Sequence, residues 1–195
     1  MSEKAMVLCS GGVDSTTCLA LAIEKHGKEN VCALSIYYGQ KHVKEIQAAK
    51  AVLEYYGIEG TSLDLTPVFA YSDCSLLSHS TEDIPEESYA EQLAQRGGNY
   101  GAHHDDAAGN ADPDCSEDFV NAMNHSIVLG SGGDVRIEAP FVRWNKAQIV
   151  SEGLRLQVPY QLTWSCYEGG DKPCGKCGTC LDRIRAFEAN GVTDP

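Results

Sequence analysis

Hydrophobic and polar positions follow two alternating patterns in the first third of the chain. Short runs at residues 4–9, 31–38 and 61–65 predict strands, and the apolar residues 5–9 predict that the first of them is buried. Between them, apolar residues recur at helical spacing over residues 16–25 and 41–56, and Gly57 is expected to end the second helix. Strands that alternate with helices are typical of a parallel sheet covered on both faces. The sequence therefore predicts an α/β fold with a doubly wound parallel sheet.

The pattern weakens in the middle of the chain and returns near its end. Ser, Gly, Asp and Asn dominate residues 66–114, which indicates loops. Helical spacing returns at residues 117–129 and 145–156, the second with Asn145 as a candidate cap, and residues 134–139 between them predict a further strand. A cysteine-rich segment at residues 166–180 leads into a final helix. The second half is therefore expected to be less regular than the first.

The segment Ser10–Thr16, with the sequence SGGVDST, directly follows the first apolar run. Paired glycines let the chain turn sharply and bring backbone N–H groups near an anion. A strand, a glycine-rich turn and a helix N-terminus form a ready anion site, and Asp14 or Ser15 can cap the helix. A carboxylate such as Asp14 fits beside phosphates only with a Mg²⁺ ion between them. The spacing matches neither a P-loop nor a dinucleotide fingerprint; the alternative is an ordinary glycine turn.

Charge and length exclude several classes of protein. The 195 residues, 43% of them hydrophobic, suffice for one domain with a core. Fifteen basic residues against 28 acidic ones give a net charge of −13, which argues against a protein that mainly holds a nucleic-acid backbone. We find no export signal and no apolar run of the ~20 residues that a membrane span needs. A soluble, cytoplasmic protein is therefore expected.

Nine cysteines are unusual for a chain without an export signal, in which disulfides are not expected. Four of them follow the spacing C-x7-C-x2-C-x2-C: Cys166, Cys174, Cys177 and Cys180. Four thiolates satisfy one tetrahedral, structural Zn²⁺; unligated thiols, a redox pair and an iron–sulfur cluster are the alternatives. Four others are expected to be small core residues: Cys9, Cys18, Cys32 and Cys74. The expected division is an α/β domain over residues 1–165 and a zinc knuckle with its helix over residues 166–195.

Five stretches together resemble one family. They are residues 8–18 with the glycine-rich loop, Tyr38–His42 (YGQKH), Pro113–Cys115 (PDC), Leu162–Tyr167 (LTWSCY) and Lys172–Cys177 (KPCGKC). These stretches resemble the 7-cyano-7-deazaguanine synthases, a family of ATP ligases that have a pyrophosphatase loop and that act in queuosine biosynthesis. The resemblance runs from about residue 5 to the end of the chain, and the knuckle with Trp164 before it is its most specific part.

The resemblance implies an adenine nucleotide alpha hydrolase-like fold and a carbon–nitrogen ligase. In such a ligase, 7-carboxy-7-deazaguanine, ATP and ammonia give 7-cyano-7-deazaguanine through an adenylated acid and an adenylated amide. It also implies a structural Zn²⁺, Mg²⁺, small-molecule partners without nucleic acid or membrane, and leaves a homodimer open. Asp14 and Ser15 are the catalytic residues it implies. The nucleotide-binding residues are Leu8, Cys9, Ser10, Gly11, Gly12, Val13, Asp14, Ser15, Thr16, Thr17 and Cys18, and the substrate contacts are Asp106, Asp114 and Cys115.

The sequence departs from the family at the junction of Asn99 and Tyr100. Family members carry a helix and a strand there, and a crossover unit of that kind takes roughly 25–30 residues. One explanation is that the protein lacks a central strand. The other is that the protein contains the segment, but the numbering of this sequence runs continuously across it. A smaller departure is Asp112, where the family usually has Tyr. Two further functions stay open: a tRNA-modifying enzyme such as a thiolase with the same loop, and a truncated relative that binds nucleotide and zinc without turnover.

Overall fold

The structure is a computed structural model that describes residues 3–84, 86 and 115–195. Three parallel strands form the described sheet in the order β1-β2-β3. The strands are β1 (Ala5–Leu8), β2 (Val31–Tyr37) and β3 (Gly60–Asp64). The α-helices are α1 (Val13–His26), α2 (Lys44–Tyr56), α4 (Glu117–Gly130), α5 (Lys146–Arg155) and α6 (Gly178–Ala189), with short 3₁₀ turns η1 (Lys28–Asn30) and η3 (Tyr160–Leu162). The β-α-β-α-β order and the parallel sheet confirm the predicted α/β class.

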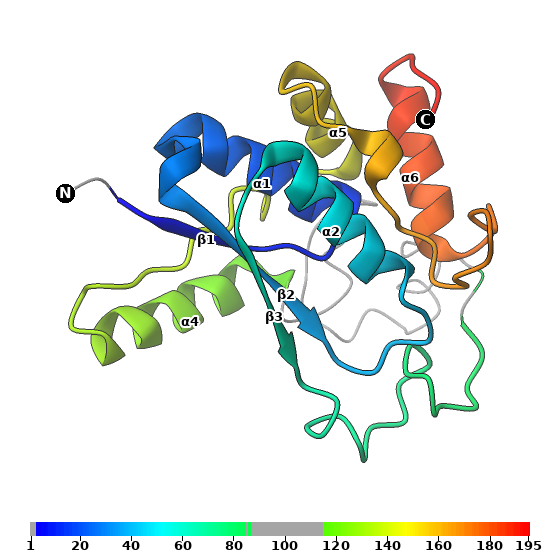
Figure 1. The fold of residues 1–195 in the computed structure, drawn as a ribbon, viewed down its shortest axis with the longest axis horizontal. Helices are drawn as coiled ribbons and strands as arrows, with labels where there is room; N and C mark the ends of the chain where they lie inside the picture. The colour runs from blue at the N-terminus through cyan, green and yellow to red at the C-terminus, as the bar shows by residue number, and fades with distance from the viewer. Residues whose placement is uncertain (1–2, 85, 87–114) are drawn as a thin grey trace.

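Register places the carboxyl ends of the strands at one edge of the sheet. Ala5 lies opposite Val31 in the first pair of strands, and Ala33 lies opposite Gly60 in the second. Figure 1 shows α1 and α2 on one side of the strands and α4 on the other. The loop that leaves β1 therefore opens at the edge where ligands of doubly wound sheets bind.

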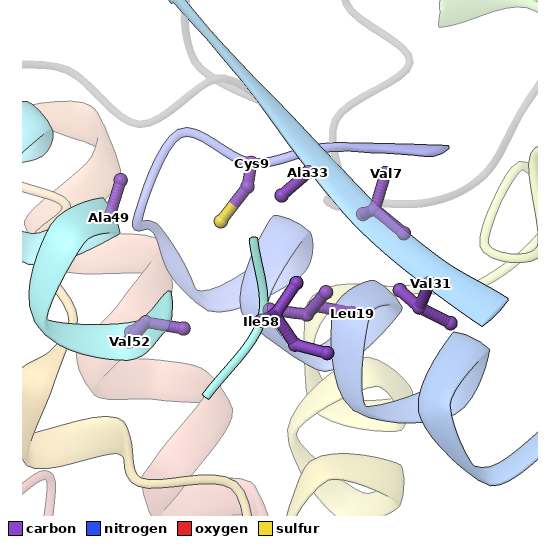
Figure 2. Close-up of a cluster of buried hydrophobic side chains, with 8 residues drawn as sticks. All are labelled: Val7, Cys9, Leu19, Val31, Ala33, Ala49, Val52 and Ile58. Carbon is purple, nitrogen blue, oxygen red and sulfur yellow. The ribbon is translucent and has the colours of Figure 1, made fainter. Parts of the chain in front are cut away.

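A first core fills the space between the sheet and the helices α1 and α2. Leu19 of α1 and Val52 of α2 are completely buried in it. Figure 2 shows these eight side chains: Val7, Cys9, Leu19, Val31, Ala33, Ala49, Val52 and Ile58. Because successive residues of a strand point to opposite faces, Val7 faces this core whereas Met6 and Leu8 are 63% and 64% exposed.

A second core lies on the opposite side of α1, where α5 and α6 pack. Its buried members are Val13, Ala20, Ile149, Val150, Val158, Tyr160, Ala186 and Phe187. The Tyr160 hydroxyl lies 2.8 Å from the Thr17 hydroxyl, which donates to the carbonyl oxygen of Val13. Helix α1 is thus buried on two sides, and this fixes the position of its first turn. Helix α6 shares this core with α1 and α5, and the division at residue 165 stays a prediction.

Three local predictions are wrong. Residues 134–139 form no strand, because no described strand lies beside them to complete a ladder. Side chains take the place of that ladder: Ser131 Oγ accepts from the N–H of Val135, and Asn124 Oδ1 accepts from the N–H of Ile137. Neither Asp14 nor Ser15 caps α1, since the helix already begins at Val13 with Gly12 as its N-cap. Cys74 is exposed instead of buried, because it lies in a surface turn.

Other local predictions are confirmed. Asn145 caps α5 in a complete capping box: its side chain accepts from the N–H of Gln148, whose side chain accepts from the N–H of Asn145. Gly57 ends α2 in the left-handed conformation that glycine favours. None of the helices in the described ranges is long and apolar enough to pass through a membrane.

Candidate functional site

The glycine-rich loop lies between β1 and the first turn of α1. The hydroxyls of Ser10 and Ser15 lie 3.1 Å apart, and the N–H of Ser10 donates to Ser15 Oγ over 3.2 Å. Ser15 Oγ in turn lies 3.3 Å from the carbonyl oxygen of Gly12 and donates to it. Two hydroxyls therefore lie beside the free N–H groups of the first turn of α1. Such a helix N-terminus carries partial positive charge and favours a phosphate.

Gly11 lets the loop pass directly against α2. Its φ is +83°, and a Cβ there would overlap the backbone nitrogen of Ala49 and lie 2.7 Å from the carbonyl oxygen of Glu45. Backbone atoms of a packed helix cannot move aside easily. Glycine at this position is therefore required by both conformation and space.

Replacing Gly11 with Ala is expected to lower the free energy of unfolding by about 2–5 kcal/mol, from the left-handed conformation and the overlap together. Gly132→Ala is the matched control, because Gly132 has φ +67° with no atom near its missing Cβ. The control is expected to lose only the conformational part, about 1–2 kcal/mol. Urea unfolding of both variants measures the difference; equal losses would contradict the close packing of the loop.

Asp14 has two carboxylate oxygens in different environments. Oδ2 accepts a hydrogen bond from Nζ of Lys146 at 2.5 Å. Oδ1 is buried and accepts no hydrogen bond from any residue in the described ranges. A buried carboxylate oxygen without a donor is costly unless a cation occupies the space beside it. Oxygen is also the ligand that Mg²⁺ prefers, so this atom fits the expected ion.

These groups line one cavity of about 260 Å³ at the carboxyl edge of the sheet. The lining brings together the loop, the start of α2, the start of α5 and the segment that carries the cysteines. Glu45 contributes a carboxyl group to this lining, and burial raises its pKa above the usual range. The lining residues from the loop are Ser10, Gly12, Val13, Asp14 and Ser15, and those from the C-terminal part are Trp164, Ser165, Tyr167, Thr179, Asp182 and Arg183.

The other predicted nucleotide-binding residues lie around the cavity without lining it. Cys9, Thr16 and Thr17 are buried beneath the loop. Leu8 is exposed at the end of β1, and Cys18 packs against the first core. Of the predicted substrate contacts, Cys115 lies in the cavity wall. Asp106 and Asp114 lie outside the described residues.

The four predicted cysteines converge at the N-terminus of α6. Their Sγ atoms all lie within 4.8 Å of one another, and those of Cys174 and Cys180 are 3.9 Å apart. Tetrahedral zinc with Zn–S bonds of 2.3 Å requires a separation of about 3.8 Å. The N–H groups of Cys174 and Cys177 donate to the sulfurs of Cys166 and Cys174, each over 3.3 Å. The donor set and its geometry therefore fit a closed, structural zinc site.

The thiols of the cysteine cluster differ in how the protein shifts their pKa values. Burial raises the pKa of the Cys166 and Cys180 thiols. Burial also raises the pKa of the Cys174 thiol, but hydrogen bonds, led by that from the N–H of Lys176, outweigh it and lower the pKa to about 7. At neutral pH the Cys174 thiol is therefore closer to ionisation than the thiols of Cys166 and Cys180. A cation would be required to hold all four sulfurs as thiolates.

Trp164 joins the cysteine segment to the glycine-rich loop. Its backbone N–H donates to the carbonyl oxygen of Gly11 over 2.9 Å, and its indole N–H donates to the carbonyl oxygen of Cys166 over 2.7 Å. The ammonium group of Lys44 lies 5.5 Å from the centre of the indole ring. Trp164 therefore links the knuckle to the glycine-rich loop through a backbone hydrogen bond to Gly11.

Comparison with known proteins identifies the family. A family model described as "Queuosine biosynthesis protein QueC" matches residues 4–96 and 86–191. The chain is 39% identical over 217 residues to a 7-cyano-7-deazaguanine synthase of Archaeoglobus fulgidus, covering 98% of this chain and 89% of that protein. It is 38% identical over 219 residues to the enzyme of that name in Marinobacter nauticus, covering 100% and 97%. The chain belongs to the QueC family.

One solved structure is similar at a much lower level. NMN synthetase from Francisella tularensis is 14% identical with a TM-score of 0.47, over 98% of this chain and 79% of that one.

The curated relatives differ from this chain in length over the aligned region. The alignments extend over 216 to 219 residues although this chain has 195, so the relatives carry residues without a counterpart here. The two segments matched by the family model meet at residues 86–96, close to the junction of Asn99 and Tyr100. The printed sequence continues through that junction, which lies outside the described residues. The relatives therefore carry residues that this chain lacks, and the placement of these residues at the junction of Asn99 and Tyr100 stays a prediction.

Sequence reasoning missed two basic residues of the cavity, Lys146 and Arg183. Lys146 directly follows Asn145, the predicted cap of a helix. The cap signals the helix, but no local pattern signals that Lys146 contacts Asp14. Arg183 is buried and fully engaged: its guanidinium pairs with Asp194 at 2.8 Å and donates to the Thr163 hydroxyl and the carbonyl oxygen of Tyr160. Arg183 therefore ties the C-terminus to the core, and Lys146 is the more available cation.

Proposed function

We propose that this QueC protein converts 7-carboxy-7-deazaguanine, ammonia and ATP into 7-cyano-7-deazaguanine. The curated relatives carry the name of that synthase over nearly their whole length. The observation that carries the proposal is the cavity itself, whose wall combines the glycine-rich loop with the segment around the cysteine knuckle. Both elements are those on which the family resemblance depends.

In this proposal the chain acts by placing phosphates and neutralising their charge. The N–H groups at the start of α1 and the hydroxyls of Ser10 and Ser15 bind the phosphates of ATP. Asp14 is the residue that would hold Mg²⁺, which supplies charge neutralisation when bound. Positioning and electrostatic stabilisation together can provide most of the acceleration that such a transfer needs.

The reaction balances without a nucleophilic side chain. A carboxylate oxygen of the substrate attacks the α-phosphorus, pyrophosphate leaves, and ammonia then displaces AMP to give the amide. The amide oxygen attacks a second ATP in the same way. Loss of that AMP and of the remaining amide protons leaves the nitrile. We propose Cys115 as a contact of the deazapurine because it lies in the cavity wall; the roles of Asp106 and Asp114 stay predictions.

We propose that Zn²⁺ is structural here, because four thiolates leave no coordination position open. Its contribution to activity runs through Trp164, whose N–H holds Gly11. Thiolate ligands persist in a reducing compartment, so we also propose a cytoplasmic location. Small molecules are the expected partners, and a homodimer stays open to measurement.

The expected result of the direct assay is nitrile formation that requires ATP, ammonia and 7-carboxy-7-deazaguanine together. Chromatography with mass detection follows the acid, the amide and the nitrile. AMP formation that instead requires tRNA would favour the tRNA-modifying alternative. A folded, zinc-containing protein that reacts with neither 7-carboxy-7-deazaguanine nor tRNA would favour the third alternative, a truncated relative without turnover.

A further inference from the structure

We propose that Lys146 neutralises Asp14 in the nucleotide-free protein and binds a phosphate oxygen of ATP once a divalent cation takes its place. This role rests on the proposed function only in taking ATP as the ligand. The starting observation is the 2.5 Å pair between Lys146 Nζ and Asp14 Oδ2, in the wall of the cavity. The lysine side chain is 29% exposed and the aspartate side chain is 48% exposed, so this pair is partly shielded from water.

The position of Lys146 in its own helix points to a role outside that helix. It is the first residue of α5, whose first turn contains no acidic residue. A cation at a helix N-terminus faces the positive end of the macrodipole and is unfavourable there. The capping box of Asn145 and Gln148 already satisfies the helix end. Asp14 is thus the group that compensates this lysine.

The two oxygens of Asp14 can serve two cations in turn. Oδ2 is taken by Lys146, while Oδ1 is buried and receives no hydrogen bond from the part of the chain that the structure describes. A divalent ion attracted to Oδ1 would compete electrostatically with the ammonium group for one negative charge. The displaced ammonium would stay in the same wall as Ser10 and Ser15, where phosphates are expected.

Arg183 cannot take this role in its place. Its guanidinium is held by Asp194, Thr163 and the backbone of Tyr160. Of the two basic side chains in the described lining, Lys146 is therefore the one that can exchange an intramolecular carboxylate for a phosphate. An ammonium group is well suited to this exchange because it is a point charge on a flexible stem.

The test is Lys146→Gln, with Lys25→Gln as the matched control. Lys25 also forms a lysine–carboxylate pair, with Glu138 at 2.6 Å, but away from the cavity. Binding of Mn²⁺ alone is followed by electron paramagnetic resonance, and binding of the α,β-methylene analogue of ATP with Mg²⁺ is followed by calorimetry. Neither measurement needs the deazapurine.

We expect Lys146→Gln to bind Mn²⁺ at least tenfold more tightly than the unaltered protein, because the competing ammonium is gone. We expect it to bind the nucleotide analogue roughly 10- to 100-fold more weakly, as for loss of a hydrogen bond to a charged group. Lys146→Arg keeps the charge and should keep the weak Mn²⁺ binding of the unaltered protein. Lys25→Gln should change neither affinity.

Unchanged or weaker Mn²⁺ binding in Lys146→Gln would overturn the competition, and unchanged binding of the analogue would overturn the phosphate contact. If Lys146→Gln does not fold, tight Mn²⁺ binding by Lys146→Arg overturns the proposal, and binding as weak as in the unaltered protein supports it. A different result would contradict the proposed function alone: the affinities of the variants shift as expected, but the unaltered protein forms no nitrile.

Discussion

Asp14→Asn is expected to reduce kcat/KM for AMP formation by a factor of about 100 to 1000. This range is typical of removing one group that stabilises charge in a transition state. The substitution keeps the shape of the side chain and removes its charge. The oxygen Oδ1, which is buried and accepts no hydrogen bond in the described structure, then no longer attracts a divalent cation. Measured rates of AMP release at saturating Mg²⁺ test this expectation.

Asp64→Asn is the control for that experiment. Asp64 ends β3 at the same edge of the sheet, and its Oδ1 accepts from the N–H of Thr66. Its rate should stay within about twofold of the unaltered protein, since surface substitutions rarely matter. An Asp14→Asn protein that retains full activity would remove Asp14 from the site. The zinc content of the Asp14→Asn protein should be unchanged, because Asp14 lies outside the cluster of four cysteines.

Cys177→Ser is expected to lose zinc and much of the stability of the C-terminal part. Structural zinc sites of zinc-finger peptides contribute about 10–16 kcal/mol of apparent binding free energy, and binding there is coupled to folding. Cys177 is buried and serves as the N-cap of α6, which packs against α5 and contributes Ala186 and Phe187 to the second core. Zinc per chain, by atomic emission, and the melting temperature are the measurements.

Cys74→Ser serves as the control for the metal experiment. Cys74 is exposed and lies outside the cluster, so the variant should keep one zinc per chain and its melting temperature. Full zinc content in Cys177→Ser would refute the assignment of the ligands. Loss of zinc should also reduce nucleotide binding, because Trp164 between the knuckle and the loop donates to Gly11.

The sequence predicts the elements whose local signals and tertiary environment agree. The strands around Val7 and Ala33 are short apolar runs, and the structure buries these residues in one core. The cysteine spacing predicts convergence because four thiols share one bound ion, and the four sulfurs lie together. The cap at Asn145 is equally local, since the partner Gln148 lies within the same turn.

The remainder depends on contacts that no local pattern records. Lys146 is separated from Asp14 by 132 positions, and only the packing of α5 on α1 brings them together. The predicted strand at residues 134–139 lacks a described neighbour, and strand propensity without a partner does not make a strand. Cys74 shows the same limit for burial, which is decided by the turn around it and not by the residue type.

The most direct test of the account uses 7-carboxy-7-deazaguanine with ¹⁸O in both carboxylate positions. If the acid and then the amide are adenylated, each substrate oxygen leaves on a separate AMP. Mass spectrometry should then find two AMP molecules for each nitrile, each with one ¹⁸O. Unlabelled AMP, or ADP in place of AMP, would contradict the proposed reaction at this site.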